Sequence, residues 1–508
     1  MKYNYTPLIQ LRRKVFVEVA KMAYDDPSHL EENIEQAVYN IVPGEVAQYR
    51  ESVFKERAIV GERLRMAMGL KMRKVDEHQR LSQGIDDALK PERVVHNELI
   101  QVVPFACEAC PEKTYHVTEN CRKCLAHPCI QDCPKNAISM GKYGSVIDDE
   151  KCIRCGKCKE ACPYNAIIDY DRPCAKACGV NAIKSDYLGR AEIEQDKCVK
   201  CGMCLSACPF GAISDKSEIF QLIQAIKSDV DVHAIIAPAF IGQFGPFAKP
   251  DTIFRAIKAL GFKSVVEVAL GADIESVVEA REFIEKVPNE LSFLGTSCCP
   301  AWYDAATLNF PEMKENISSS ATPMVATSRF IKKENPDAKV VFIGPCLAKK
   351  NEASRPELEN IIDFVITFEE LMGIFVAYGI QLDDYVDNTE ERESDASLSG
   401  RGYANSGGVA EAIINTIGEI DPSVEVKYYN ADGLYECMKM LKLAKAHKYD
   451  GYLLEGMGCP GGCVGGPGTL ISRRKAAQQL NEFKTESPYF TAFENPKVPA
   501  EKNTTKEV

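Results

Sequence analysis

The 508-residue sequence has one tryptophan, no long apolar run, no apolar leader and no excess of positive charge. No segment approaches the ~20 consecutive apolar residues that cross a bilayer, so we expect no membrane-spanning helix. The N-terminal stretch MKYNYTPLIQLRRKVFVEVAKMAYDD lacks the apolar core of a signal peptide, and we expect a cytoplasmic protein. The net charge of −12 argues against nucleic acid or anionic membranes as the main partner, which leaves small electron carriers or small molecules.

Cysteine, in contrast, is abundant, with 22 residues in the chain. The cytosol keeps thiols reduced, so in a protein expected there the sequence favours metal ligands over disulfides. Sixteen of the 22 lie between Cys107 and Cys208, and the other six lie between Cys298 and Cys463. This uneven distribution predicts two separate cofactor regions.

The first region contains a fourfold repeat. Each copy has two cysteines with three residues between them, then proline or glycine, two more residues and Ala-Ile. The copies are CIQDCPKNAI (129–138), CKEACPYNAI (158–167), CAKACGVNAI (174–183) and CLSACPFGAI (204–213). Two copies extend to C-x2-C-x2-C-x3-C-P, which is typical of bacterial 4Fe-4S ferredoxins. These complete motifs are Cys152, Cys155, Cys158 and Cys162, and Cys198, Cys201, Cys204 and Cys208. Zinc is the alternative, but a zinc ribbon has no use for a fourth cysteine before proline.

The remaining thiols can be assigned because the cysteine before proline ligates the partner cluster in such motifs. One pair of clusters would use Cys121, Cys124, Cys129 and Cys162, and Cys133, Cys152, Cys155 and Cys158. The other pair would use Cys107, Cys110, Cys174 and Cys208, and Cys178, Cys198, Cys201 and Cys204. The pattern resembles four-cluster ferredoxin-type electron-transfer subunits and predicts two to four 4Fe-4S clusters. His127 is an alternative ligand, but beside Pro128 it is more simply a loop residue.

Because an iron-sulfur module carries single electrons, the site that uses them should lie downstream. From about residue 231, short apolar segments alternate with helical ones, which predicts a parallel α/β domain. The expected strands are VHAIIAPAF, SVVEVAL, LSFLGTS, AKVVFIGPC, FVITF, VKYYNA and YLLEGMGC. Ligands bind beyond the carboxyl ends of such strands. We therefore expect five thiols at one edge of one sheet: Cys298, Cys299, Cys346, Cys459 and Cys463.

Three motifs of this region, TSCCPAW, GPCLAKKNE and EGMGCPGGCVGG, resemble the signature motifs of the FeFe hydrogenases in order and spacing. The resemblance covers about residues 230–470. It implies an H-cluster, in which a 4Fe-4S cube is joined through a thiolate to a two-iron centre with CO, cyanide and an azadithiolate bridge. It further implies that Cys463 bridges to the two-iron centre and that four thiols hold the cube: Cys299, Cys346, Cys459 and Cys463.

The same resemblance implies a proton route. Cys298 would be the acid that passes a proton to the azadithiolate amine, which suits a thiol because its pKa moves readily with its surroundings. The alternative is a buried structural cysteine. Glu279, Ser318 and Glu282 would relay the proton to water. For Glu279 the alternative is a solvated charge, since it falls on the polar side of a helix whose apolar stripe is Ile274, Val277, Val278 and Ile284.

Further side chains would surround the two-iron centre. The resemblance implies that Lys349 donates to a cyanide ligand, that Met457 packs on the cluster, and that Pro238 and Ala239 line the cyanide side. The chain also departs from the family pattern, which indicates a divergent branch: Gly344 replaces a methionine, Met324 a glutamine, and Tyr403 stands near a usual phenylalanine.

Together these observations divide the chain into four segments. They are a helical N-terminal region (1–100), a ferredoxin-like domain with up to four 4Fe-4S clusters (101–216), an FeFe-hydrogenase catalytic domain (217–484) and a loosely ordered C-terminal tail (485–508). The expected fold is an α+β ferredoxin-like module followed by an α/β parallel-sheet H-cluster domain.

The resemblance implies an enzyme that interconverts dihydrogen with protons and electrons. Its expected partners are a ferredoxin and the H-cluster maturation proteins. The alternative is a hydrogen sensor or an iron-sulfur assembly or recognition protein of the same fold. The assembly proteins lack the thiol, lysine and methionine that stand here at Cys298, Lys349 and Met457, and the sensors carry an extra signalling domain that we do not find in this sequence.

Overall fold

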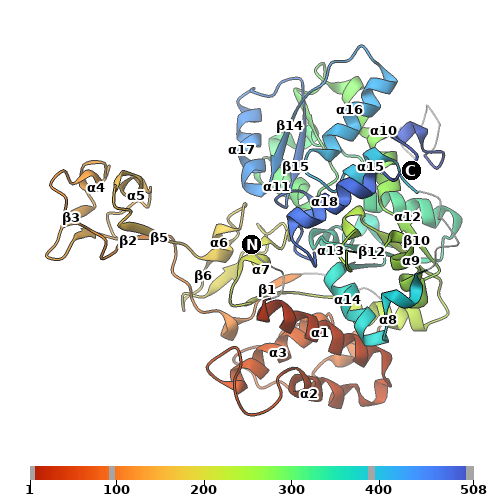
Figure 1. Ribbon diagram of the computed structural model, residues 1–508, viewed down its shortest axis with the longest axis horizontal. Coiled ribbons are helices and arrows are strands. Elements are labelled where there is room, and N and C mark those ends of the chain that lie inside the picture. Colours follow the sequence, from red (N-terminus) through yellow and green to blue (C-terminus); the bar gives the residue numbers. More distant parts are fainter. Residues whose placement is uncertain (1–5, 91–97, 247, 387–394, 499–508) are drawn as a thin grey trace.

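The computed structural model describes residues 6–90, 98–246, 248–386 and 395–498 (Figure 1). A helical N-terminal part lies at the bottom of the view, small antiparallel sheets project to the left, and a larger α/β part forms the rest. This confirms the predicted fold class, a ferredoxin-like module followed by a parallel α/β domain, with helices before both. Within the described ranges, every helix is too short or too polar to cross a membrane.

The N-terminal helices pack on the α/β part. The first helix begins after Thr6, whose hydroxyl accepts a hydrogen bond from the Ile9 N–H at 3.3 Å, and Pro7 fits its first turn. This helix packs against α8 (Ile219–Lys227) and α14 (Phe368–Tyr378), where Phe16 lies against Gly373. The elements of this part are α1 (Pro7–Tyr24), η1 (Pro27–His29), α2 (Leu30–Ile41), α3 (Val53–Ala67) and η2 (Ile85–Leu89).

The ferredoxin-like part consists of four two-stranded antiparallel sheets and four short helices. Strand pairs are β1 (Ile100–Val102) with β8 (Ile213–Asp215), β2 (Thr114–Val117) with β5 (Ile167–Tyr170), β3 (Ile138–Met140) with β4 (Ser145–Ile147), and β6 (Ile183–Ser185) with β7 (Ala191–Ile193). The helices are α4 (Pro128–Gln131), α5 (Lys157–Ala161), α6 (Pro173–Lys176) and α7 (Met203–Ala207), and η3 (Pro104–Ala106) follows β1. Figure 1 shows that β2 to β5, with α4 and α5, form a projecting outer lobe.

The four repeat copies fold alike. In each, a short helix carries the first cysteine and a strand begins at the isoleucine of Ala-Ile. The turn between them holds one residue with positive φ at the same repeat position: Asn136 (50°), Asn165 (48°), Asn181 (53°) and Gly211 (59°). Asparagine and glycine tolerate this left-handed conformation better than other residues. The repeat seen in the sequence is therefore a repeat of backbone geometry.

The α/β part contains all seven expected strands, and all of their pairings are parallel. They form two sheets, however, and the expectation of one sheet is wrong. The four-stranded sheet has the order β10 (Ser264–Glu267), β9 (Val232–Ile236), β12 (Lys339–Gly344), β13 (Phe364–Thr367). The three-stranded sheet has the order β11 (Phe293–Gly295), β15 (Tyr452–Met457), β14 (Lys427–Asp432). An apolar run predicts a strand, but the choice of its neighbour depends on contacts distant in sequence.

Helices cover both sheets. Beside the three-stranded sheet, Leu453 packs with residues of α10 and α16, and Leu454 packs with residues of α11 and α17, because successive side chains of a strand face opposite sides. The remaining helices are α9 (Pro250–Ala259), α10 (Ala269–Lys286), α11 (Pro300–Asn309), α12 (Pro323–Glu334), α13 (Ala348–Glu352), α15 (Leu398–Gly402), α16 (Gly408–Ile420), α17 (Leu434–Lys445) and α18 (Arg473–Lys484). Short 3-10 turns are η4 (Pro238–Phe240), η5 (Pro311–Asn316), η6 (Pro356–Leu358), η7 (Leu382–Tyr385), η8 (Cys463–Gly465) and η9 (Ala492–Glu494).

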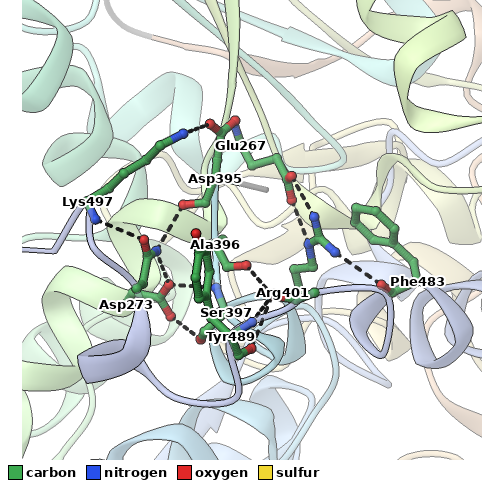
Figure 2. Close-up of polar contacts among 11 residues, drawn as sticks. Glu267, Asp273, Asp395, Ala396, Ser397, Arg401, Phe483, Tyr489 and Lys497 are labelled. Atoms are coloured by element: carbon green, nitrogen blue, oxygen red, sulfur yellow. Dashed lines mark hydrogen bonds and ion pairs between the residues drawn. The ribbon is translucent and has the colours of Figure 1, made fainter. Parts of the chain in front are cut away.

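The C-terminal segment 485–498 is fixed to the α/β part by a polar network (Figure 2). Buried Asn495 donates to Asp273 of α10 at 2.9 Å, and Lys497 pairs with Asp395 at 2.7 Å. The expectation of a loosely ordered tail is therefore wrong for these residues, because charge composition did not reveal their buried partners. The rest of the tail lies outside the described residues.

Replacing Arg401 with methionine (Arg401→Met) should lower the free energy of unfolding by about 3–5 kcal/mol. Arg401 donates to both carboxylate oxygens of Glu267, at 2.8 and 2.9 Å, and both side chains are buried (Figure 2). The substitution leaves the Glu267 charge buried without this partner. Urea unfolding followed by circular dichroism measures the change. Lys445→Met, which breaks an exposed pair with Glu312, serves as control and should cost less than about 1 kcal/mol; equal losses in both variants would contradict the prediction.

Candidate active site

Five thiols gather where three strands end. Cys298 and Cys299 follow β11, Cys346 follows β12, and Cys459 and Cys463 follow β15. Since β12 belongs to the four-stranded sheet and the other two strands to the three-stranded sheet, the thiols lie at the junction of two sheets. The expectation of one shared sheet edge is wrong, although the carboxyl ends of the strands do supply the thiols.

The loop that carries the paired cysteines is positioned by the single tryptophan. Trp302 is fully buried, and its Nε1 donates to the Thr296 carbonyl at 2.9 Å. The indole lies directly on Gly456 of β15, where a Cβ atom would stand 2.1 Å from the ring. Any side chain at this position would therefore displace the tryptophan. This contact fixes the loop after β11 against β15.

The thiols are close enough to influence one another. The Gly458 N–H donates to the Cys299 sulfur at 3.4 Å. Burial raises the pKa of Cys346 to about 11 and that of Cys463 to about 12, and the Cys299 thiol adds to both effects while Lys349 opposes them. Thiolate sulfur is the donor that a 4Fe-4S cube takes, and a nearby ammonium stabilises it. The donor set therefore fits the cube of an H-cluster.

Two of the predicted cluster sets line cavities in the ferredoxin-like part. One cavity is lined by Cys107, Cys110, Cys174 and Cys208, and another by Cys121, Cys124, Cys129 and Cys162. In the described ranges, no three His, Cys, Asp or Glu side chains are placed to hold a single metal ion. Each of the two cavities is lined by four thiols, the number of ligands that a 4Fe-4S cube takes.

The other two sets also come together. Burial, and then the thiols of Cys201, Cys198 and Cys178, raise the pKa of Cys204 well above its ordinary value. Burial raises the pKa of Cys158, Cys152 and Cys155 add to that effect, and Cys133 packs in the same apolar cluster. That these sets bind clusters stays a prediction.

One backbone contact recurs in every repeat and was not predicted. The alanine N–H of Ala-Ile donates to the sulfur of the cysteine before proline or glycine. The four pairs are Ala137 to Cys133 (3.2 Å), Ala166 to Cys162 (3.4 Å), Ala182 to Cys178 (3.2 Å) and Ala212 to Cys208 (3.4 Å). Hydrogen bonds to sulfur tune the reduction potential of an iron-sulfur cluster. The sequence signal for this contact was the invariant spacing within the four copies.

Two of the ferredoxin-type thiol sets and the thiols at the sheet junction adjoin one another. Cys204 lies close enough to Cys174 for that thiol to affect its pKa, and Cys201 is likewise affected by Cys299. Cys201 also acts on the pKa of Cys459. The set that contains Cys201 and Cys204 therefore adjoins both another ferredoxin-type set and the thiols at the sheet junction. Clusters held by these sets would therefore be neighbours of a cluster held at the junction.

Glu279 is buried beside the paired cysteines, and the alternative of a solvated charge is wrong. Its side chain is 2% exposed, whereas Val278, expected on the apolar stripe, is 42% exposed. Helix α10 packs against α12, α15 and α16, so its covered face is wider than the stripe suggests. Burial raises the Glu279 pKa. Burial also raises the pKa of Cys298 well above its ordinary value, with Cys299 and Glu279 adding to it.

A hydrogen-bond chain runs from Glu279 to the surface. Ser297 donates to the Glu279 Oε1 through both its N–H and its hydroxyl, at 2.8 Å each, and the Ser320 hydroxyl donates to the same oxygen at 2.9 Å. Ser318 lies 3.1 Å from Ser320 and donates to Glu282 at 2.5 Å. The structure thus connects all three predicted relay residues. Ser297 and Ser320 were missed, although both stand beside motif residues in the sequence.

The outer end of this chain is a surface ion pair. The Glu282 carboxylate accepts from Lys286 at 2.8 Å, one turn further along α10, and the lysine side chain is 36% exposed. The pair raises the pKa of Lys286. The hydrogen-bond chain therefore ends at solvent.

Lys349 and Met457 occupy buried positions near the junction. Lys349 donates to the Thr322 hydroxyl and to Glu352, both at 3.1 Å, and its pKa is raised despite burial because of Glu352 and the neighbouring thiols. Met457 packs in the apolar cluster that joins α10 and α16 to the three-stranded sheet. Ala239, after Pro238 in η4, packs instead in the core of the four-stranded sheet. The structure does not bring these residues into one apolar cluster.

Two departures from the expected pattern have a structural reason. At Gly344, a Cβ atom would lie 2.5 Å from the Phe342 ring, so the ring occupies the space of a larger side chain. The Tyr403 hydroxyl lies 2.9 Å from that of Ser276 on α10, and this hydrogen bond satisfies a buried phenol where phenylalanine needs none.

Comparison with known proteins gives consistent matches. Residues 230–467 match the family model of the iron-only hydrogenase large subunit, C-terminal domain. Residues 145–168 match a 4Fe-4S binding domain, and residues 167–219 match the LdpA Fe-S cluster-binding domain.

Two of the similar curated proteins are hydrogenases. The chain is 28% identical over 434 residues to iron hydrogenase 1 of Clostridium pasteurianum, covering 73% of each protein. It is 26% identical over 414 residues to the NADP-reducing hydrogenase subunit HndD of Solidesulfovibrio fructosivorans, covering 71% of this chain and 64% of that subunit, less than two thirds of its length. An apo FeFe-hydrogenase structure from Chlamydomonas reinhardtii aligns at 22% identity with a TM-score of 0.43, covering 53% of this chain and 89% of that one. The family-model and curated-protein matches support a divergent FeFe-hydrogenase-like protein, similar to that family over residues 230–467 and to 4Fe-4S binding domains before them.

Proposed function

We propose that the protein is an FeFe hydrogenase that interconverts dihydrogen with protons and electrons, and that a ferredoxin exchanges electrons with it. The observation that carries this proposal is the meeting of two routes at one place. The series of thiol sets ends at the junction of the two sheets, and the hydrogen-bond chain from Lys286 ends beside Cys298 at the same junction. An enzyme that joins protons with electrons needs both.

The residues present would hold an H-cluster. Cys299, Cys346, Cys459 and Cys463 would be its thiolate ligands, with Cys463 as the bridge. When bound, this group supplies the iron at which hydrogen is formed or split. The chain contributes a buried ammonium at Lys349, kept charged by Glu352.

Cys298 would hold the proton nearest to the reaction. Its thiol is neutral at ordinary pH because burial raises its pKa, and it can therefore act as a general acid. Glu279 would exchange that proton, oriented by the two hydrogen bonds from Ser297. Ser320 and Ser318 would pass it to Glu282. The presence of the Cys298 thiol, with Lys349 and Met457, supports turnover over the assembly alternative.

The projecting outer lobe would receive electrons from the partner. The lobe projects away from the α/β part (Figure 1), and the Cys155 thiol within it is exposed. A ferredoxin is a small carrier that can approach such a lobe. Maturation proteins would be needed to install the two-iron centre.

Infrared spectroscopy of anaerobically matured protein tests the proposal. We expect CO and cyanide stretching bands together with hydrogen evolution from reduced ferredoxin. Protein made without the maturation proteins is the control and should lack the bands. Bands without turnover would favour the sensor, and absence of bands from matured, iron-loaded protein would contradict the proposal.

The iron content tests the cluster assignment. Four ferredoxin-type clusters hold about 16 irons and an H-cluster about 6, so fully loaded protein should contain about 22 per chain. Iron is measured by colorimetry or mass spectrometry against protein from amino-acid analysis. A loaded sample that saturates at about 14 would show that only the two complete motifs bind clusters. The use of Cys107, Cys110, Cys121 and Cys174 as ligands would then be wrong.

A further inference from the structure

The proton route described above leaves one buried acid unexplained. Glu275 lies one turn before Glu279 on α10 and is 6% exposed. Its Oε2 atom has no hydrogen-bond partner among the described residues, and the same is true of the Oε2 of Glu279. Burying a carboxyl group without full hydrogen bonding is costly, so such a group calls for an explanation.

Ser320 stands between this acid and the relay. Its hydroxyl lies 2.9 Å from Glu279, 3.1 Å from Ser318 and 2.8 Å from Ser297. It also acts by hydrogen bonding on the pKa of Glu275, as does the N–H of Ala321. One hydroxyl therefore faces two carboxyl groups of neighbouring helical turns as well as the serine that leads to the surface.

We propose that the proton route forks at Ser320, and that Glu275 is a second carboxyl group that holds a proton beside Glu279. The proposal rests on the proposed hydrogenase function. Glu275 is a positioning residue in this scheme, because it acts through Ser320 and Glu279 and has no contact with the reacting atoms.

The transfer between the two acids is balanced. Protonated Glu275 gives its proton to the Ser320 oxygen while the Ser320 hydroxyl gives its own to the Glu279 carboxylate. An O–H bond breaks at Glu275 and another forms at Glu279, while the Ser320 oxygen loses one O–H bond and gains one, so the serine is regenerated with its hydrogen turned. One proton moves and no electron is transferred.

The surrounding charges favour a stored proton. Burial, and then the neighbouring Glu279 carboxylate, raise the pKa of Glu275 to about 8 against the opposing effect of Arg329 of α12. From the end of α15, Tyr403 also faces this pair, and burial keeps its phenol neutral. Two adjacent buried carboxyl groups cannot both ionise without repulsion, so one of them keeps a proton at neutral pH.

The polar groups that accompany Glu275 lie on the same side of α10. Ser276 and Tyr403 are joined at 2.9 Å, and the Tyr403 pKa is raised by burial and then by Glu279, Cys298 and Glu275. Polar groups therefore surround the inner end of the route. They offer places for a proton that an apolar lining would not.

Infrared titration of protein made without the maturation proteins tests the fork independently of turnover. The wild type should show a carboxylic C=O band that disappears as the pH rises through about 8. Glu275→Gln should lack this band, and Glu285→Gln, an exposed acid on the same helix, should keep it. Ser320→Ala should move its loss to higher pH, because the serine hydrogen bond lowers the Glu275 pKa. An unchanged titration in Ser320→Ala would overturn the proposal.

Turnover of the matured protein provides the second test. Glu275→Gln should slow hydrogen evolution at least about threefold below pH 8 and remove the fall in rate near that pH. The loss in rate should stay below the ~100-fold expected when a route loses its only acid, because the branch through Ser318 to Glu282 remains. Glu275→Asp keeps a carboxyl group and should restore part of the dependence of the rate on pH. This result would show that the loss in Glu275→Gln does not come from a folding defect. A Glu275→Gln profile equal to that of the wild type would refute the fork. If the infrared shift is present but the wild type shows no turnover, the hydrogenase function fails, and the proton route with it.

Discussion

Cys298→Ala should keep its CO and cyanide bands and its full iron content while its hydrogen turnover falls at least ~100-fold, the usual effect of losing a positioned acid. The reason lies in the difference between two adjacent thiols. Cys299 accepts a hydrogen bond from Gly458 and belongs to the thiol group at the sheet junction, whereas the nearest ionisable groups to Cys298 include Glu279. Proton delivery should fail while cluster binding survives.

Infrared spectra and hydrogen evolution at several pH values measure this effect. The matched control is Cys437→Ala, which removes another buried thiol whose contacts are the carbonyls of Ala431 and Met457. The control should retain turnover within a small factor. If Cys298→Ala loses its cluster while Cys299→Ser keeps one, the assignment of the pair is off by one residue. Full activity in Cys298→Ala would remove the support for the Glu279 route and for the fork at Ser320.

Cys346→Ser should abolish turnover together with the CO and cyanide bands. A serine hydroxyl is a poor replacement for a thiolate on iron, so the cube should not assemble and the two-iron centre should have no attachment. The iron content should fall by about 6 from the fully loaded value. Electron paramagnetic resonance of the reduced protein should still show the ferredoxin-type clusters, because their thiols come from a different part of the chain.

Cys121→Ser is the corresponding control in the outer lobe. It should lose about four irons from one ferredoxin-type cluster and keep the infrared bands. Its turnover with ferredoxin should decrease because electrons enter less readily, whereas the junction thiols are untouched. Retention of the bands in Cys346→Ser would show that Cys346 is not a ligand of the cube.

Strands and repeats were readable from the sequence because their signals are local. Short segments rich in apolar residues predicted the seven strands, and the spacing of cysteines predicted which thiols would come together in the ferredoxin-like part. The division into two sheets was not readable. This division arises because β11 pairs with β15, which lies more than 150 residues further along the chain.

The surroundings of Glu279 show the same limit. A helix covered on one side has an apolar stripe, but α10 is covered by three helices, and its buried face includes Asp273, Glu275, Ser276 and Glu279. Helix periodicity alone assigns such acids to solvent. Only the resemblance to a family indicated Glu279, and it gave no indication of Ser320 or Glu275, whose importance depends on the folded contacts.

The position of Cys346 has a consequence for the integrity of the protein. In the proposed site it would be the ligand that follows a strand of the four-stranded sheet, whereas Cys299, Cys459 and Cys463 follow strands of the three-stranded one. A cube bound by all four is a cross-link between two separate sheets, and such a link restricts the unfolded chain much as a disulfide does. Chemical damage to the cluster would therefore remove this cross-link as well as the catalytic group. A chain that has lost its iron would unfold first at the junction of the two sheets.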